Sequence, residues 1–273
     1  ERGIPSIQNW RDNEARLETE NRRLQLHYQD LSGLAGNLHG SHRLVVSEID
    51  ERYRDLRGRV GSGTYDIRTT TDQVGLNSSL SWIRGAHVFS GTLKAARYDQ
   101  TERDYLRPDP DVDRVRRQLT TALSHEWDSQ EGRWQTQAVA RRYRVNDDTQ
   151  TVTPTGALEN TEGTEQYTGW HLGARFAPVE PLRLYANVAR QIRVPTLVER
   201  FGQQGLFVGN SELEAEEALN TDLGLRALFG RGFVEVTGFH RDLDPAIVAI
   251  HDARGVGRYV NVAAVIRGVE ARA

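Results

Sequence analysis

The chain has 273 residues, a formal net charge of −3, 27% charged residues and no cysteine. Its mean hydropathy is −0.62. No run of roughly 18 apolar residues occurs, which excludes a membrane-spanning helix. The near-neutral charge gives no electrostatic case for nucleic acid, and the lack of cysteine excludes disulfides and thiolate metal sites.

Apolar and polar residues alternate with a period of two along most of the chain, which is typical of β-strands with one apolar face. We expect about eleven strands, many near the length of roughly ten residues found in tilted membrane strands. In chain order they are centred on residues 24–28, 44–46, 76–82, 89–95, 119–123, 134–140, 170–176, 182–188, 219–227, 232–241 and 258–272.

The connections between these strands alternate in length. The short ones are "IRGA" (83–86), "DSQEGR" (128–133), "APVEP" (177–181) and "FGRG" (229–232). The long ones cover roughly 50–70, 99–112, 145–165, 191–216 and 243–258. Short turns on one rim and long loops on the other are typical of transmembrane β-barrels, whose alternating faces keep the mean hydropathy low. A soluble β-sandwich, with the same aromatic residues filling a core, would not need this alternation and is the alternative.

Within each expected strand, one face is apolar and the other is polar. Leu184, Leu223 and Leu225 are predicted to contact lipid, and aromatic residues near strand ends fit the girdles at the membrane interfaces. Those aromatic residues are Tyr28, Trp82, Trp170 and Phe176. The predicted lumen-facing residues are Gln25, Asn77, Ser79, Arg175, Arg183, Asn187, Asp222 and Arg226. They would contact a plug in a plugged barrel and line water in an open porin, and the pattern alone leaves both open.

Several segments resemble the boxes of TonB-dependent outer-membrane receptors and arrive in that family's order. "ANVARQIRVPTLVERF" resembles the first box and "VGNSELEAEEALNTDLGLR" the second. "VEVTGFHRDLDPAIV" and "YVNVAAVIRGVEARA" look like two later strands, and "ERGIPSIQN" resembles a segment often seen in mid-barrel. The matching residues are Arg193, Pro195, Thr196, Glu199, Gly209, Asn210, Leu213, Glu216, Asn261, Gly268 and Glu270. Ser211 and Ala215 replace prolines of the second box, which predicts a less rigid loop.

This resemblance implies the fold, the cargo and the partners. The implied fold class is all-β, with residues 1–273 as an antiparallel transmembrane β-barrel segment of about eleven strands from a plugged barrel of about 22. The implied function is TonB-energised uptake of a large scarce nutrient, a ferric siderophore or cobalamin, at the outer membrane of a Gram-negative bacterium. The implied partners are the TonB complex, acting through a plug domain that we expect to be absent here, the ligand, and outer-membrane lipid and lipopolysaccharide. A passive porin and a soluble β-rich binding module remain alternatives.

A basic stretch, "ERYRDLRGR", is the candidate for ligand capture in a long loop. It carries Arg52, Arg54, Arg57 and Arg59 around Tyr53. Arginine forks match the oxygens of carboxylates and phosphates, so an anionic chelate or lipopolysaccharide is a possible ligand. A solvated loop, neutralised by neighbouring acidic residues, is the simpler interpretation. Phe201 and Phe207, in the long 191–216 connection, are the candidate aromatic contacts for a ligand.

Other chemistries find little support. The eight histidines are scattered, and "HGSH" (His39 and His42) has no carboxylate partner at metal-site spacing. No histidine lies between Pro195 and Asn210, which disfavours haem as the cargo implied by the resemblance. "GRVGSGT" (58–64) lacks the lysine of a phosphate loop. No catalytic constellation emerges, so we predict no enzyme activity, no cofactor and no metal.

The start and the edges of the chain carry two further expectations. Methionine is absent and residue 1 is Glu, so we expect a processed chain or a piece of a longer one. About half a barrel cannot close, so the strands near 24–28 and 259–270 should form open edges, unpaired on their outer sides.

Overall fold

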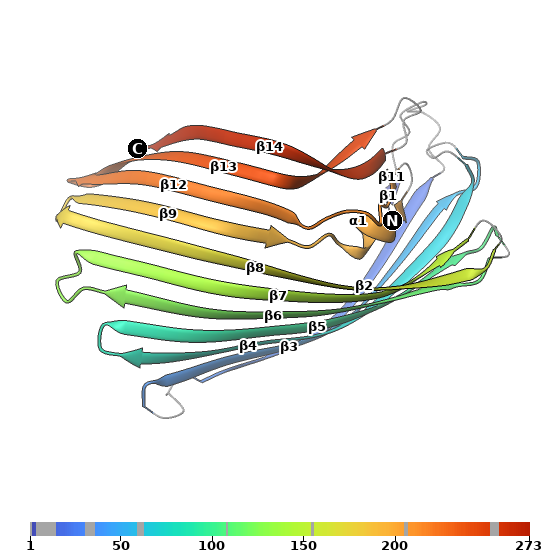
Figure 1. Ribbon diagram of the computed structural model, residues 1–273, viewed down its shortest axis with the longest axis horizontal. Coiled ribbons are helices and arrows are strands. Elements are labelled where there is room, and N and C mark those ends of the chain that lie inside the picture. The colour runs from blue at the N-terminus through green and yellow to red at the C-terminus, as the bar shows by residue number, and fades with distance from the viewer. Residues whose placement is uncertain are drawn as a thin grey trace.

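A computed structural model describes residues 2–3, 15–30, 36–58, 63–107, 109–153, 156–204, 207–251 and 257–273. Within these ranges the chain forms one curved 14-stranded sheet and one short helix (Figure 1). The expected all-β class is confirmed. Of the segment "ERGIPSIQN", only Arg2 and Gly3 are among the described residues, and Arg59 is not among them.

Eleven of the described strands have 12 residues or more, in agreement with the predicted number. They are β2 (Arg16–Gln29), β3 (Leu38–Asp55), β4 (Tyr65–Arg84), β5 (His87–Asp104), β6 (Val112–Asp128), β7 (Trp134–Val152), β8 (Leu158–Val179), β9 (Leu182–Arg193), β12 (Glu216–Phe229), β13 (Gly232–His251) and β14 (Gly257–Arg272). The short elements are β1 (Arg2–Gly3), the helix α1 (Leu197–Phe201), β10 (Gln203–Gln204) and β11 (Phe207–Val208).

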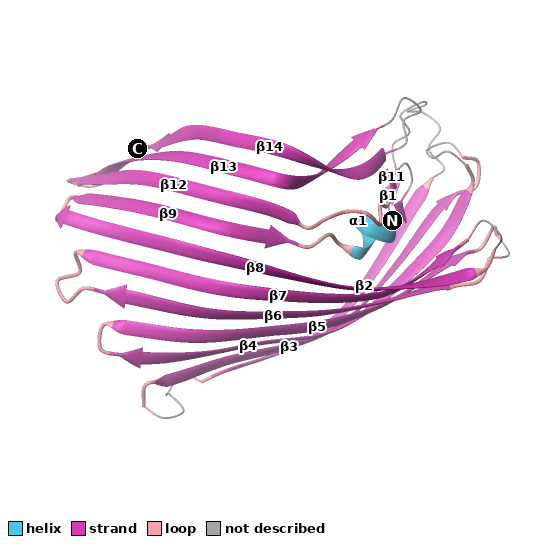
Figure 2. Ribbon diagram, viewed as in Figure 1, coloured by secondary structure: helices cyan, strands magenta, loops and turns pink. Residues whose placement is uncertain are grey.

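The long strands pair antiparallel with their chain neighbours, in the order β2 to β9, β12, β13 and β14. The four predicted short turns lie together at one rim of the sheet, on the left in Figure 2. Gly85 and Gly230, with φ of 58° and 54°, occupy two of them. Positive φ suits the tight hairpin turns that match the twist of paired strands, and glycine adopts it without strain. We call this rim the turn rim and the opposite one the loop rim.

The predicted long loops at the loop rim are mostly wrong, because the strands run further than the apolar pattern indicated. The connections shrink to residues 56–64, 105–111 and 153–157, while β13 continues to His251. Only the connection after β9 is long, at residues 194–215. A strand such as β8, with 22 residues, rises about 3.3 Å per residue and exceeds the roughly 25 Å apolar band of an outer-membrane barrel. Beyond that band the outer face is mostly polar as well, so the strands continue there without an apolar outer face to mark them.

The two faces of the sheet differ, as the sequence predicted. The register pairs Leu184 with Leu225 on one face, and Asn187 with Asp222 on the other. Side chains of the first face, here called the outer face, are exposed; Leu223 retains 67% of its accessible surface. The other face, the inner face, is covered in part by residues 194–215, and Figure 1 shows α1 inside the curve of the sheet. All eight predicted lumen-facing residues lie on the inner face.

Exposed apolar residues on the outer face gather in the half of the sheet next to the turn rim. Examples are Leu26 at 58%, Leu123 at 73% and Leu223 at 67% exposed. Buried residues gather in the half next to the loop rim. There Ala15, Tyr53, Tyr65 and Ile67 form one cluster. We call these the turn-side half and the loop-side half.

The sheet is open within the described residues, as expected. β2 and β14 do not pair with each other. Their outer edges are not wholly bare, however. Arg2 and Gly3 of β1 pair with β2, and Phe207 and Val208 of β11 pair in parallel with the start of β14. Among the described helices none is both long and apolar enough to span a membrane.

Candidate functional site

The long connection 194–215 begins with a capped helical turn. Thr196 caps α1: its hydroxyl accepts a hydrogen bond from the Glu199 amide at 3.1 Å, and the Glu199 carboxylate accepts one from the Thr196 amide at 2.8 Å. This reciprocal arrangement is a capping box, which satisfies two amides that a helix start otherwise leaves free. So short a helix cannot persist on its own propensity, and its position depends on contacts with the sheet.

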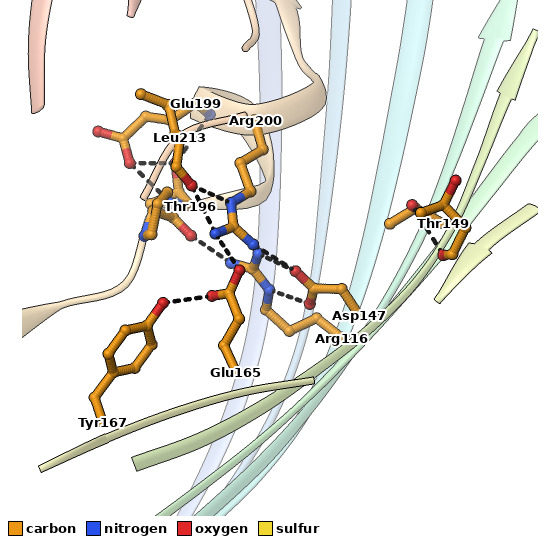
Figure 3. A network of polar contacts seen from close by, with 11 residues as sticks. Arg116, Asp147, Thr149, Glu165, Tyr167, Thr196, Glu199, Arg200 and Leu213 are labelled. Carbon is orange, nitrogen blue, oxygen red and sulfur yellow. Dashed lines mark hydrogen bonds and ion pairs between the residues drawn. The ribbon is translucent and has the colours of Figure 1, made fainter. Parts of the chain in front are cut away.

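A buried network of charges fastens this connection to the inner face (Figure 3). Arg116 of β6 donates two hydrogen bonds of 2.6 Å to Asp147 of β7, and a third to the Pro195 carbonyl. Arg200 of α1 donates to Asp147 at 3.2 Å and to Glu165 of β8 at 2.6 Å. The Arg116, Arg200 and Asp147 side chains are 3%, 7% and 10% exposed. Two arginines therefore depend on one buried carboxylate.

The backbone of the connection completes this network. Arg200 also donates to the Leu213 carbonyl, at 2.7 and 3.2 Å from its Nη2 and Nε atoms. Leu213 itself is 2% exposed. The Tyr167 hydroxyl donates to the second Glu165 oxygen at 2.8 Å. Every charged group of the network thus has partners, which offsets the cost of removing charge from water.

A second set of contacts joins the connection to its flanking strands. Arg193, at the end of β9, donates to Glu199 at 3.0 Å and to Glu216, at the start of β12, at 3.3 Å. Glu216 also accepts from the Ile247 amide of β13 at 3.0 Å. Burial alone raises the pKa of Glu199, but the hydrogen bonds from Thr196 and Arg193 outweigh it and lower this pKa below its ordinary value of 4.5.

The returning part of the connection is held at Gly209 and Asn210. The Asn210 amide donates to the Glu199 carbonyl at 2.9 Å, and its side chain donates to the Tyr259 carbonyl of β14 at 3.0 Å. A Cβ at Gly209 would lie 2.6 Å from the Phe201 nitrogen, so only glycine fits. The Asn261 side chain accepts a hydrogen bond from the Glu214 amide at 2.9 Å and donates one to the Glu214 carbonyl at 3.3 Å.

Most residues of the family boxes therefore meet in one place. Nine of the eleven build the folded connection or its attachments: Arg193, Pro195, Thr196, Glu199, Gly209, Asn210, Leu213, Glu216 and Asn261. Gly268 and Glu270 lie on β14 towards the turn rim. A Cβ at Gly268 would lie 2.8 Å from the Phe239 ring, so its part is to accommodate that ring.

The basic stretch does not converge on one ligand surface. Arg52, Tyr53 and Arg54 lie on β3, not in a loop, and their side chains alternate between the faces. Arg52 faces outward and pairs with Asp66 at 2.8 Å, and Arg54 pairs with Glu18. Tyr53 points inward and is buried. Arg57 is exposed in the following turn.

The two candidate aromatic residues also have partners within the chain. The guanidinium carbon of Arg114 lies over the Phe201 ring, 5.7 Å from the centroid of that ring. Phe207 contacts the rings of His251 and Tyr259 at 5.0 and 5.7 Å. Whether these two residues, or the arginines of β3, contact a ligand stays a prediction.

A cavity of about 370 Å³ lies between the start of the connection and the inner face of β3 to β6. Its roof is residues 194–198, and its polar lining is Glu51, Thr71, Gln73, Tyr98, Gln100, Arg116 and Gln118. Such a lining can hydrogen-bond a polar group. The described part of the chain holds no cluster of three or more histidine or carboxylate residues suited to a metal ion.

Sequence reasoning missed Arg116, Asp147, Glu165 and Arg200, the centre of the network. They come from three strands and one helix, and no fixed spacing connects them. The available signal was weak: charged residues at inward positions of β6, β7 and β8, opposite a connection that itself carries an arginine.

Comparisons with known proteins agree with this geometry. The family described as "TonB dependent receptor-like, beta-barrel" matches residues 2–273. No curated protein matches the chain. Among solved structures, the copper transporter OprC matches with a TM-score of 0.76 and 14% identity, over 93% of this chain and 43% of that one.

Two further structures are similar in the same way. The Serratia marcescens hemophore receptor HasR, solved with its hemophore HasA and heme, matches with a TM-score of 0.65 and 16% identity, over 94% of this chain and 46% of HasR. The FrpB iron transporter of Neisseria meningitidis matches with a TM-score of 0.64 and 14% identity, over 93% and 41%. This chain spans less than half the length of each. Since the family match covers nearly the whole chain, the chain belongs to the TonB-dependent receptor family, within its β-barrel domain.

Proposed function

We propose that this barrel segment serves in TonB-energised uptake of a large scarce nutrient across the outer membrane of a Gram-negative bacterium. A ferric siderophore is the first candidate ligand and cobalamin the second. The solved structures that resemble the chain include a copper transporter, a hemophore receptor and an iron transporter. Copper, heme and iron are named with these three proteins, which supports a metal chelate as the cargo here.

The observation that carries the proposal is the folded connection on the inner face. In a passive porin the lumen is an aqueous channel, and polar residues line the water. Here a 22-residue connection (194–215) lies over the inner face and is fastened by two buried arginines. A fixed obstruction favours a receptor that is opened by energy input over a channel that conducts continuously.

The outer face supports the membrane location over a soluble module. Leu123, Leu223 and Val269 are each more than 60% exposed on one continuous face. A soluble monomer rarely exposes a contiguous apolar surface of this extent. A bilayer covers it, and the apolar residues occupy the strand segments nearest the turn rim, as a membrane band requires.

Transport by the whole receptor that carries this barrel tests the proposal. A host without its own siderophore receptors would be given radiolabelled ferric siderophores and cobalamin, with and without a functional TonB. We expect uptake of a ferric siderophore that stops when TonB is removed. Uptake that continues without TonB, together with ligand-independent conductance in planar bilayers, would establish the porin alternative.

A pair of adjacent substitutions sharpens this test. Asp147→Ala removes the carboxylate shared by Arg116 and Arg200, so the connection should detach and uptake should fall. Asp148→Ala removes the same charge from the next residue, whose side chain faces outward, and uptake should persist. Equal loss in both variants would show that the fastened connection has no special part in transport.

A further inference from the structure

The inner face of β3 to β7 carries cations that the chain itself does not neutralise. Arg43 of β3 and Lys94 of β5 lie on either side of Asn77 of β4 in the register. Arg141 of β7 lies opposite Ala122 of β6, one level nearer the turn rim. Each of the three cations is exposed, and none forms an ion pair with a described residue. We call Arg43, Lys94 and Arg141 the inner cations.

The part of the inner face around these cations contains no carboxylate. It consists of the inward residues of the ranges 39–49 in β3, 71–83 in β4, 88–98 in β5, 118–124 in β6 and 139–145 in β7, all of which the structure describes. The next inward carboxylates along β3, β6 and β7 are Glu51, Glu126 and Asp147. We call this part of the inner face the cationic sector.

The inner face of β8 to β14 differs, because its charges are mixed. Arg226 of β12 forms an ion pair with Glu235 of β13 at 3.7 Å. Asp222 of β12 and Glu270 of β14 also face inward on this side. The positive charge of this side is therefore offset by carboxylates of the same chain, whereas that of the cationic sector is not.

The cationic sector lies behind the apolar part of the outer face. Leu76 and Leu93, the sequence neighbours of Asn77 and Lys94, face outward and are 40% and 38% exposed. In the outer-membrane placement proposed above, the sector lines the lumen at the depth of the hydrocarbon. A hollow with charges of one sign and walls of low dielectric constant focuses the electric field and raises the local concentration of counter-ions. The cationic sector should therefore attract anions.

The spacing of the inner cations indicates the size of the anion. Arg43 and Lys94 lie two strands apart at one level, so their Cα atoms are about 10 Å apart, and Arg141 lies about 12 Å from Lys94. A phosphate or a lone carboxylate would meet one of these side chains. A wider anion with several charged groups can meet two or three, and Asn77 and Thr120 offer neutral hydrogen-bonding groups between them.

We propose that the cationic sector selects a large anionic cargo, a ferric chelate with several negative charges, and guides it past β3 to β7 rather than past β8 to β14. Arginine forks match carboxylate oxygens, and the lysine ammonium adds a flexible point charge. A neutral chelate gains nothing from these cations. This inference rests on the uptake proposed above, and it specifies the charge of the cargo and the side of the lumen along which the cargo passes.

Uptake of two iron chelates by the whole receptor, in the receptor-deficient host described above, tests the charge of the cargo. The radiolabelled probes are a ferric tris-catecholate, which is an anion, and a ferric tris-hydroxamate of similar size, which is neutral. The anion should reach half-maximal TonB-dependent uptake at a concentration about tenfold lower than the neutral chelate. Equal or better uptake of the neutral chelate would overturn this inference and leave the proposed function standing. TonB-dependent uptake of neither chelate would contradict the proposed function, and this inference with it.

Matched triple variants locate the selecting side chains. R43Q/K94Q/R141Q should raise the half-maximal concentration of the tris-catecholate about tenfold and change that of the tris-hydroxamate little. R43K/K94R/R141K keeps the charges at the same positions and should take up the anion as the unaltered receptor does. R175Q/R183Q/R241Q removes the same charge from the mixed side of the inner face and should also preserve its uptake.

Two results with these variants would overturn the proposal. Equal losses of both chelates in R43Q/K94Q/R141Q would show that the inner cations support the structure of the receptor and do not select by charge. Equal losses of the anion in R43Q/K94Q/R141Q and R175Q/R183Q/R241Q would show that no one side of the lumen guides it. Receptor amounts are matched by heat-dependent gel migration, and Lys94→Gln provides the same comparison if the triple variant assembles poorly.

The dependence on salt separates attraction at a distance from damage to the fold. Raising the ionic strength from 0.01 M to 0.15 M shortens the Debye length from about 30 Å to about 8 Å. The difference in anion uptake between the unaltered receptor and R43Q/K94Q/R141Q should therefore shrink over this range. A difference that stays constant as salt is added would contradict the guiding role of the cationic sector.

Discussion

The same strands run through the turn-side and loop-side halves of the sheet, but the two halves differ in which face is apolar and which is buried. In the turn-side half the outer face is apolar and exposed, as at Leu123 and Leu223, and the strands are joined by tight turns. In the loop-side half most of the buried residues lie on the inner face, and many are charged. Arg114, Arg116 and Arg200 are each no more than 7% exposed there.

The side chains of the two halves are therefore held in place by different surroundings. The turn-side half suits a solvent of hydrocarbon, because many of its outward apolar side chains, such as Leu123 and Leu223, stay largely exposed within the described residues. The loop-side half supplies its own partners, through ion pairs and hydrogen bonds that join β6, β7 and β8 to α1 and to the backbone of the connection. Substitutions should therefore affect assembly into lipid in one half, and the position of the connection 194–215 in the other.

The largest expected effect is in the loop-side half, at Asp147. Asp147→Ala leaves Arg116 and Arg200 without their shared carboxylate, and removing one partner of a buried ion pair costs about 3–5 kcal/mol. The free energy of unfolding of the assembled barrel in lipid vesicles measures this loss. Asp99→Ala removes a carboxylate from an exposed pair with Arg97 and should change little. Similar losses in both variants would contradict the buried network.

The next effect belongs to the turn-side half, at adjacent residues of β12. Leu223→Arg places a charge on the lipid face, which costs about 2–4 kcal/mol near the bilayer midplane. Asp222→Arg places the same charge on the inner face, opposite Asn187, and should cost far less. The yield of folding into vesicles distinguishes them. Equal losses would show that the assignment of the faces is wrong.

A smaller effect is expected where the connection turns back, at Gly209. A Cβ there would lie 2.6 Å from the Phe201 nitrogen and 2.7 Å from the Arg200 carbonyl oxygen, and such overpacking costs about 1–3 kcal/mol. Gly209→Ala should speed hydrogen exchange of the Asn210 amide. In the control Gly163→Ala, in β8, the added Cβ would meet no atom within 4 Å. The Asn210 amide of this variant should therefore exchange at the same rate as in the unaltered protein.

The smallest effect is a dependence on acid at Glu199. Its pKa is lowered in the folded protein, so its contribution to stability is present above the ordinary value of 4.5 and is lost as the pH falls through the folded value. The exchange of the Asn210 amide should accelerate over this acid range. In the Glu199→Gln variant the Asn210 amide should exchange faster at neutral pH and lose that part of the pH dependence. An identical acid response in the variant and the unaltered protein would show that Glu199 does not hold the connection.

The two halves also differed in how far the sequence could predict them. Along β9 and β12 the alternation of Leu184, Asn187, Asp222 and Leu223 identified both faces correctly, because lipid imposes a period of two. In the loop-side half no such constraint acts, so β3 was ended too early and Arg52 was placed in a loop. The pairing of Asp147 with Arg200 depends on how a connection folds across three strands, which local patterns do not encode.

The most direct test of the account is the accessibility of the two rims on intact cells. The chain contains no cysteine, so single cysteines can be introduced into its part of the receptor at Ser211, in the connection 194–215, and at Arg231, in the turn between β12 and β13. A membrane-impermeant thiol reagent should label the cysteine at 211 and leave that at 231 unlabelled until the outer membrane is permeabilised. The longer loops of outer-membrane barrels face the cell exterior and the short turns face the periplasm, so we expect the loop rim to lie outside. Labelling at 231 but not at 211 would reverse this topology and contradict the account.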